Sequence, residues 1–138
     1  AEDFAARAQQ HQLDLVQLIS PTTTPERTEV ILSAAHGFVY CISVAGTTGV
    51  RNELPLELST QLRSLRKQTT LPLAVGFGIS SPDQVTTLEG VADGVIVGSA
   101  IVRLIADADS AADAVSAVQE FAAAMNAAVA AVAPSMPR

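Results

Sequence analysis

Short apolar runs alternate with helical patterns along this chain, and this alternation constrains the fold more than any other feature. The runs are Leu13 to Ile19, Phe38 to Ile42, Leu73 to Phe77 and Gly94 to Val97. Each run is short and nearly continuous, which is typical of a strand buried on both faces of a parallel sheet. Strand and helix in regular alternation predict an α/β chain whose parallel strands are joined by right-handed crossovers.

The segments between these runs carry the end signals and the spacing of helices. Thr24 precedes Pro25 as a helix cap, and Ser81 to Gln84 has the S-x-x-Q form of a capping box. Helices are expected over Ala1 to His11, after Thr24, across Leu54 to Leu65, from Ser81 to Gly90, from Ser99, and over Ala111 to Ala133. Valines in the last segment also allow a coiled coil, but too few heptads are present to favour it over a helix packed on the sheet.

Composition excludes several classes of protein. The 138 residues predict a single unit spanning residues 1–138, and the net charge of −6 with no Trp argues against a nucleic-acid partner. Cys41 is the one cysteine, so it forms neither an internal disulfide nor a Cys-based zinc cage, and no metal site is expected. Its place inside an apolar run predicts a small buried hydrophobe. No continuous apolar stretch approaches the ~20 residues that span a bilayer, and no signal-peptide pattern opens the sequence. We therefore expect a cytoplasmic protein without membrane contact.

Glycine and hydroxyl residues follow the strands at the ends where parallel α/β proteins place their function. Gly76 to Ser80 follows the third run, and Gly98 to Ile101 follows the fourth. Glycine lets backbone N–H groups approach a phosphate, and a helix beginning at Ser99 would point its unpaired N–H groups to the same place. Tight turns alone are the alternative. Two such loops about twenty residues apart favour a phosphate site of the kind that barrel enzymes form after their last strands.

Four motifs in register resemble the tryptophan synthase alpha chain family. They are Gly37 to Ser43, Gly46 to Gly49, Val75 to Ser80 and Ala92 to Val102, and the turn at Pro21 to Thr23 agrees with them. The match covers essentially the whole chain but only the second half of that family's chain. The resemblance implies an α/β fold that is the C-terminal half of a (β/α)8 TIM barrel. This half contains strands five to eight with their helices, preceded by one helix.

The resemblance also implies an activity and its site. The family cleaves indole-3-glycerol phosphate to indole and glyceraldehyde 3-phosphate in tryptophan biosynthesis, and indole passes to a beta subunit. No cofactor is expected in this chain, because PLP belongs to the partner beta subunit. The substrate phosphate would be held by Gly49, Gly78, Gly98 and Ser99, and the pocket would include Tyr40, Thr48, Phe77 and Ile96. A mobile loop would span Ser43 to Asn52, where Gly46-Thr47-Thr48-Gly49 departs mildly from the usual Gly-Val-Thr-Gly.

The acid–base half of this chemistry is missing from the sequence. Cleavage moves one proton onto the indole ring and removes another from a hydroxyl, which calls for carboxylates in the site. The family's Glu and Asp lie upstream of Ala1, and none of the four strand ends here carries Asp or Glu. The nearest candidates, Glu53 and Asp83, are better explained as a solvated charge and a helix-dipole residue. The chain therefore has no expected catalytic residue and is predicted to be inactive alone.

Half a barrel leaves two open sheet edges and an uncovered inner face, which invite pairing with another chain. Three arrangements stay open: a missing N-terminal half, a half supplied by another chain, or a homodimer of half-barrels. A second function stays open too, namely a non-catalytic phosphate-binding half-barrel or an interaction module for a beta subunit. A third is another phosphate-binding barrel enzyme that handles sugar phosphates or thiamin precursors, against which the Gly46 to Gly49 loop argues.

Overall fold

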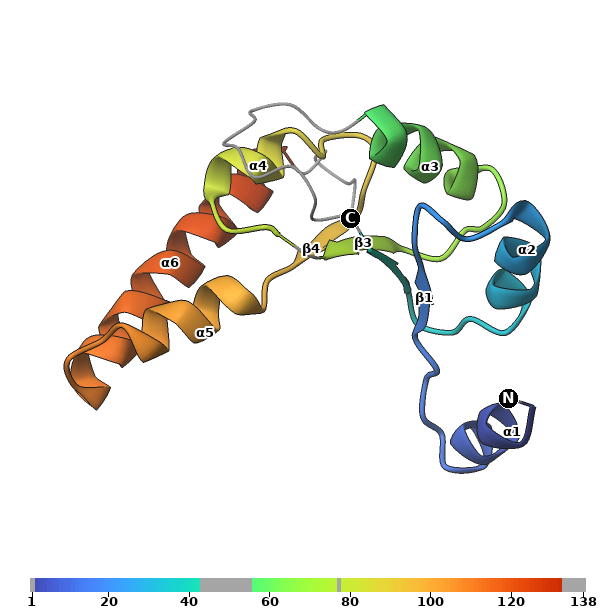
Figure 1. Ribbon diagram of the computed structural model, residues 1–138, viewed down its shortest axis with the longest axis horizontal. Coiled ribbons are helices and arrows are strands. Elements are labelled where there is room, and N and C mark those ends of the chain that lie inside the picture. The colour runs from blue at the N-terminus through green and yellow to red at the C-terminus, as the bar shows by residue number, and fades with distance from the viewer. Residues whose placement is uncertain (1, 43–55, 77, 133–138) are drawn as a thin grey trace.

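The computed structural model describes residues 2–42, 56–76 and 78–132 (Figure 1). Its strands form one four-stranded parallel sheet in the order β1-β2-β3-β4. The strands are β1 (Gln17–Ile19), β2 (Val39–Ile42), β3 (Leu73–Gly76) and β4 (Gly94–Ile96). The helices are α1 (Glu2–Gln10), α2 (Pro25–Ser33), α3 (Leu56–Arg66), α4 (Pro82–Thr86), α5 (Ser99–Ala106) and α6 (Ala111–Val132). The predicted alternation of parallel strands and helices is confirmed.

The core lies on one face of this sheet. Side chains that point to it from the strands are Ile19, Val39, Cys41, Leu73 and Val75, each at most 1% exposed. Leucines of α3 at the predicted helical spacing, Leu58, Leu62 and Leu65, pack into the same cluster. Leu88 and Val91, which follow α4, complete it. The core is therefore a layer between the sheet and its outer helices.

The other face of the sheet is open. Leu18, Tyr40, Ala74 and Gly94 are paired across the four strands at one level. Ile42, Gly76 and Ile96 form the next level toward the carboxyl ends. Because side chains alternate between the faces of a strand, these residues share the face that the outer helices do not cover. Leu18 is 54% exposed there.

The first apolar run is where the sequence prediction was wrong. Only Gln17–Ile19 pairs as a strand, whereas the run begins at Leu13, which is 64% exposed. Burial on both faces was also predicted for this strand, but Leu18 on the open face remains exposed. The physical reason is that the outer helices do not cover this face of the sheet. An apolar run indicates that its side chains favour burial, but it does not identify the segment that would bury them.

Local signals place the starts of α2 and α4 where the sequence predicted them, but α4 ends at Thr86 and not at the predicted Gly90. Thr24 Oγ1 accepts a hydrogen bond from Arg27 N at 3.3 Å at the start of α2. Ser110 Oγ accepts from Asp113 N at 3.2 Å and donates to the Asp113 carboxylate at 2.6 Å, which caps α6. The sequence predicted a helix from Ala111 but not the Ser110 cap. These side chains satisfy N–H groups that a helix start leaves unpaired.

An ion pair ties α3 to the amino-terminal end of the sheet. Asp93, just before β4, accepts a hydrogen bond from Leu73 N at 2.7 Å and pairs with Arg66 at the end of α3. Leu73 N is the first donor of a buried strand, so the Asp93 carboxylate satisfies a group that would otherwise lose its partner. This contact fixes α3, β3 and β4 relative to one another.

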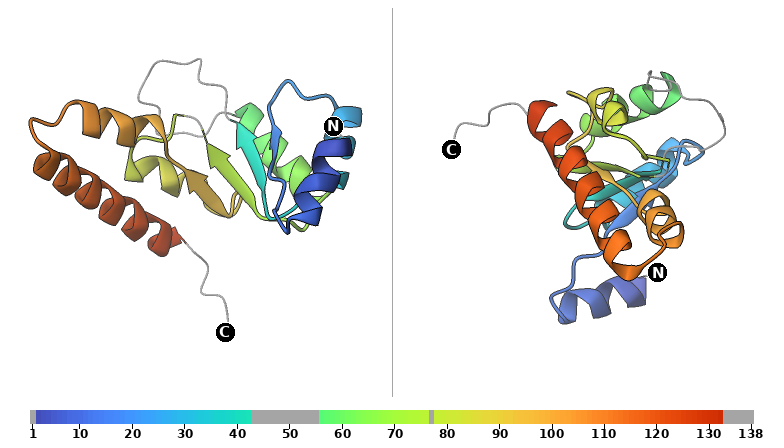
Figure 2. Two further views of the ribbon diagram at one scale, coloured as in Figure 1. Left: turned by 90° about the horizontal axis from the view of Figure 1, so that it is seen from below. Right: turned by 90° about the vertical axis from the view of Figure 1, so that its left-hand side faces the viewer.

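The long helix α6 packs against α4 and α5 rather than in a coiled coil (Figure 2). Met125 is buried on its inner face, while Val115, one of the valines in the heptad-like pattern, is 62% exposed. By length and composition alone α6 is apolar enough to cross a membrane, which the sequence analysis did not anticipate. Alanines spread between its few polar residues raise its hydropathy without forming an unbroken apolar run.

Candidate functional site

The loops after β3 and β4 meet in one groove. Its volume is about 380 Å³, and it is lined by Gly78, Ser80, Ser99, Ala100, Arg103, Leu104, Asp107 and Phe121. Gly78 and Ser99 come from loops twenty residues apart, and adjacent parallel strands bring them together because their carboxyl ends lie at one edge of the sheet. The structure thus places two of the predicted phosphate residues side by side in one groove.

The backbone conformation at position 78 favours glycine. Its φ of +84° lies in the left-handed region that side chains disfavour, and a Cβ there would meet open space. Gln84 braces the turn, because its Oε1 accepts from Ser80 N at 2.7 Å and from Ser81 N at 3.1 Å. Its Nε2 donates to Gly78 O at 3.4 Å. The predicted capping box therefore has a second effect, which is to hold the glycine turn facing the groove.

Helix α5 begins at the same groove without a side-chain cap. Gly98 occupies the capping position, so no side chain accepts from the first-turn N–H groups of α5. A Cβ at Gly98 would have nothing within 4 Å, which leaves room beside these donors. Unpaired N–H groups and the positive end of the helix dipole together favour an anion at this position.

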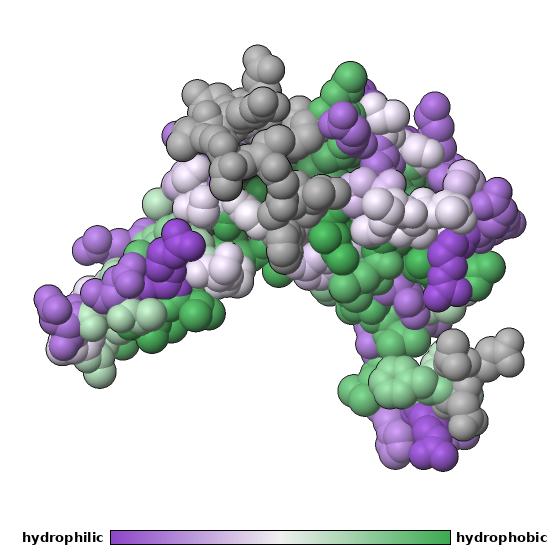
Figure 3. Space-filling model, in the orientation of Figure 1, coloured by the Kyte–Doolittle hydropathy of each residue, from purple (hydrophilic) through white to green (hydrophobic). Residues whose placement is uncertain are grey.

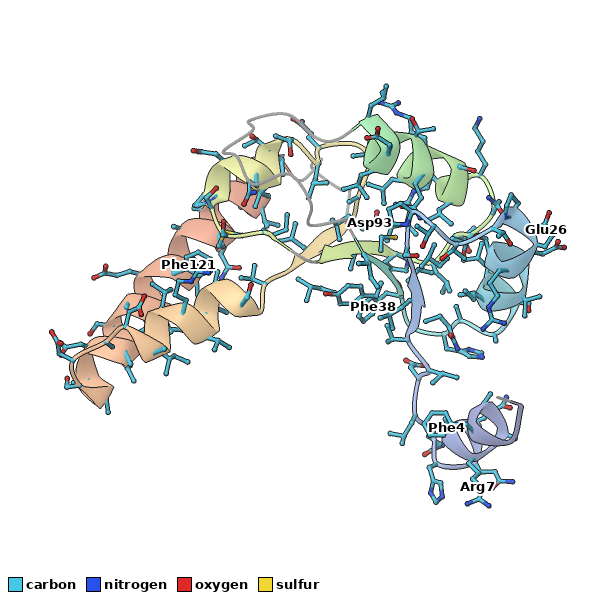
Figure 4. The ribbon with its side chains drawn as sticks, in the orientation of Figure 1. Phe4, Arg7, Glu26, Phe38, Asp93 and Phe121 are labelled. Atoms are coloured by element: carbon cyan, nitrogen blue, oxygen red, sulfur yellow. The ribbon has the colours of Figure 1, made fainter. Side chains whose placement is uncertain are left out.

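Part of the groove lining was not predicted from the sequence, namely Arg103, Asp107 and Phe121. Arg103 and Asp107 follow Ser99 at intervals of four residues, so they lie on one side of α5. That spacing was the available signal for Arg103. Phe121 enters from α6, between α5 and α6 in Figure 4, and no local pattern announces it. Asp107 caps the far end of α5, about 12 Å along the axis from its start, so its charge is remote from the helix N-terminus.

Two predicted pocket residues lie on the open face beside this edge. Tyr40 reaches over the end of β3, since a Cβ at Gly76 would collide with its hydroxyl. Ile96 pairs with Gly76 from β4 and is half-buried. Tyr40 and Ile96 therefore flank the same glycine. The other predicted contacts, Gly49, Thr48 and Phe77, and the expected loop of Ser43 to Asn52 lie outside the described residues.

Titratable groups give no acid–base pair in the described part of the chain. Burial raises the pKa of the Cys41 thiol to about 11, which suits the predicted role of a small buried hydrophobe. Asp83 is exposed in the first turn of α4, as a helix-dipole residue would be, and Glu53 lies outside the described ranges. Among the residues that the structure describes, no cluster of His, Cys, Asp or Glu could hold a metal ion.

Sequential parallel strands joined by helices, with glycine turns at their carboxyl ends, are the arrangement of consecutive strand–helix units in a (β/α)-barrel protein. A family model described as tryptophan synthase alpha chain matches residues 1–130. A relative from Carboxydothermus hydrogenoformans is 45% identical over 104 residues, which cover 75% of this chain and 39% of the relative. A relative from Rhodopirellula baltica is 48% identical over 108 residues, 78% of this chain and 39% of the relative.

Solved structures agree with the family model. The tryptophan synthase alpha chain of Legionella pneumophila superposes with a TM-score of 0.80 at 36% identity, covering 99% of this chain and 49% of its own. A chain of the Pyrococcus furiosus tryptophan synthase α2β2 complex gives 0.81 at 34% identity, covering 92% of this chain and 51% of its own. The chain belongs to the tryptophan synthase alpha chain family. It spans about half the length of these solved relatives.

Proposed function

We propose that this chain forms the phosphate-binding half of a lyase that cleaves indole-3-glycerol phosphate to indole and glyceraldehyde 3-phosphate. The observation that carries the proposal is the groove in which the Gly78 turn and the uncapped start of α5 meet. Membership of the tryptophan synthase alpha chain family supplies the reaction class. The family resemblance alone supports the proposed substrate contacts of Gly49, Thr48 and Phe77.

The role of these residues is to hold the end of the substrate remote from the reacting bond. Backbone N–H groups at Gly78 and at the start of α5 would donate to the phosphate oxygens without a lysine. Ile96, on the open face, would line the side toward the indole ring, and Tyr40 would lie near the position of the family's catalytic carboxylate. Binding energy from a remote phosphate is useful because it fixes the position of the bond that breaks.

Proton transfer would have to come from outside the described residues of this chain. None of the four strand ends carries Asp or Glu, and the one carboxylate that lines the groove, Asp107, sits at the far end of α5. Two carboxylates on the complementary half of a barrel would complete the reaction. A beta subunit that takes up the indole is the proposed protein partner, in keeping with the α2β2 complex of Pyrococcus furiosus.

A single substitution should abolish phosphate binding while the protein stays folded. Gly98→Asp adds a carboxylate at the start of α5, where φ is −123° and the new Cβ has open space. The helix dipole favours this charge, so stability should hold or rise slightly, while the carboxylate occupies the donors and repels an anion. Thr60→Asp, on an exposed position of α3, adds the same charge away from the groove.

The readout is titration of each protein with inorganic phosphate and glycerol 3-phosphate, followed by calorimetry or by NMR of backbone amides. Binding by the parent chain and by Thr60→Asp, and its loss in Gly98→Asp, would support the proposal. Equal binding by all three proteins would contradict the site. Indole release from indole-3-glycerol phosphate is measured alongside and should be undetectable for this chain. Phosphate binding without indole would fit both the lyase half and a non-catalytic phosphate-binding half-barrel, and restoration of indole release by a complementary half separates them.

A further inference from the structure

The groove at Gly78 and Ser99 contains one cationic side chain besides its backbone donors. Among the described residues that line it, Arg103 is the one cation and Asp107 the one anion. The chain as a whole carries a net charge of −6, so most of its surface repels a phosphate dianion. Figure 3 shows hydrophilic residues along the arm that α5 and α6 form, where the groove lies. A positive charge inside the groove is therefore placed to offset this repulsion locally.

The position of Arg103 on α5 directs its side chain toward the start of the helix. Side chains of an α-helix tilt toward its N-terminus, so a residue covers the turn that precedes it. The residues three and four positions before Arg103 are Ala100 and Ser99, which lie on the same side of α5 and line the same groove. Both are small, so they leave a path for the arginine stem. Ser99 precedes Arg103 by about 6 Å along the helix axis, a span that an extended arginine side chain covers.

The charge of Arg103 is not engaged elsewhere in the described part of the chain. The structure shows no ion pair and no side-chain hydrogen bond of Arg103 there. Arg66, by contrast, pairs with Asp93 and donates to Leu71 O. Asp107 lies four residues after Arg103, but a base that precedes an acid is the weaker order for such a helical pair, because the basic side chain tilts away from the acid. The guanidinium is therefore available to an anion at the start of α5.

We propose that Arg103 reaches back along α5 and makes a charged contact with the phosphate group bound at the Gly78 turn and the start of α5. This inference rests on the proposed phosphate site, and it adds a cationic side chain to a set of backbone donors. A guanidinium can donate two parallel hydrogen bonds to two phosphate oxygens, and such charge-assisted bonds are stronger than neutral ones. Backbone N–H groups would hold the phosphate from one side, and Arg103 would hold it from the side of the groove.

The test compares two variants that remove the same charge from exposed helix positions. Arg103→Gln keeps a polar side chain of similar helix propensity, so α5 should stay folded by circular dichroism and in urea unfolding. Its Kd for glycerol 3-phosphate should rise by about tenfold, because a hydrogen bond to a charged group is lost. Arg63→Gln, near the end of α3, is the matched control and should bind like the parent chain.

Two further measurements separate a charged contact from a change in the shape of the groove. Arg103→Lys keeps the positive charge, so its Kd should stay within about threefold of the parent value. Raising the ionic strength from about 0.01 M to about 0.15 M should weaken binding by the parent more than binding by Arg103→Gln, because salt screens a contact between exposed charges. A purely structural role of Arg103 would change neither comparison.

The outcomes distinguish this inference from the proposed function. Phosphate binding that is lost in Gly98→Asp but undiminished in Arg103→Gln would overturn the role of Arg103 and leave the backbone site in place. Equal weakening in Arg103→Gln and Arg63→Gln would overturn it as well, since net charge alone would then explain the effect. Arg103→Lys as weak as Arg103→Gln would refute a contact made through charge. A parent chain that binds neither inorganic phosphate nor glycerol 3-phosphate would overturn the proposed site and this inference together.

Discussion

Replacing Gly76 with alanine probes the packing of the open face at the end of β3. A Cβ at this position would collide with the Tyr40 hydroxyl and Cζ and would lie 2.7 Å from Tyr40 Cε1. Real Cβ contacts are longer, so the Tyr40 ring has to move. Tyr40 is half-buried on the neighbouring strand, so part of its side chain remains exposed to solvent.

Two opposing effects set the expected magnitude. Forced repacking costs about 1–3 kcal/mol, and a half-buried ring places this case toward the lower end. Alanine in a strand interior is more favourable than glycine by about 0.5–1 kcal/mol, because glycine loses more backbone entropy on folding. Gly76→Ala should therefore destabilise the parent chain by about 0.5–2 kcal/mol. In a Tyr40→Ala background the collision is gone, and the same change should stabilise the fold by about 0.5–1 kcal/mol.

Urea unfolding of the parent, both single variants and the double variant measures this reversal of sign. Gly94→Ala is the control, since its Cβ would sit 3.9 Å from Ala74 Cβ in ordinary contact. It should be neutral or slightly stabilising with or without Tyr40. If Gly76→Ala has the same sign in both backgrounds, the tyrosine does not occupy the space over Gly76 and the reasoning is refuted.

Three further predictions concern the core and the turns. Burial raises the pKa of Cys41 from 9.0 to about 11, so the contribution of the neutral thiol to stability is fully present below about pH 9. This contribution should be lost as pH rises toward 11, by about 2–3 kcal/mol, and urea midpoints of Cys41→Ala should lack that loss. Asp93→Ala should cost about 1–3 kcal/mol, because it leaves Leu73 N unpaired, whereas Arg66→Ala removes a half-exposed ion pair and should cost less than about 1 kcal/mol in thermal unfolding. Gln84→Ala should cost about 1 kcal/mol and weaken phosphate binding, and Gln84→Glu, which keeps the acceptor for Ser80 N and Ser81 N, should retain the stability.

The fold was predictable because its signals are local and repeated. Thr24 with Pro25 marks a helix start, and the leucine spacing of α3 marks the face that is buried at Leu58, Leu62 and Leu65. Exposure was not predictable in the same way. Leu18 lies in an apolar run because its side chain favours burial, yet burial depends on what packs against the sheet. A sequence pattern carries no information on whether that cover is present.

The candidate site was predictable only in part, and for a physical reason. Gly78 and Ser99 were placed together by the rule that parallel strands end at one edge, which needs no tertiary detail. Phe121 reaches the groove through the packing of α6 on α5, which depends on a helix angle that the sequence does not state. Arg103 lies between these cases, because its spacing from Ser99 was visible but the existence of a groove beside it was not.

Phosphate binding and acid–base chemistry differ in how much of a barrel each requires. The groove at Gly78 and Ser99 is built within two neighbouring strand–helix units, with Gln84 and the start of α5 holding its backbone donors. In the proposed function, the carboxylates that act on the far end of the substrate would face it across the barrel, from strands other than these four. On the proposed function, the anion site would therefore lie within this half of the barrel, and the acid–base groups would come from the other half.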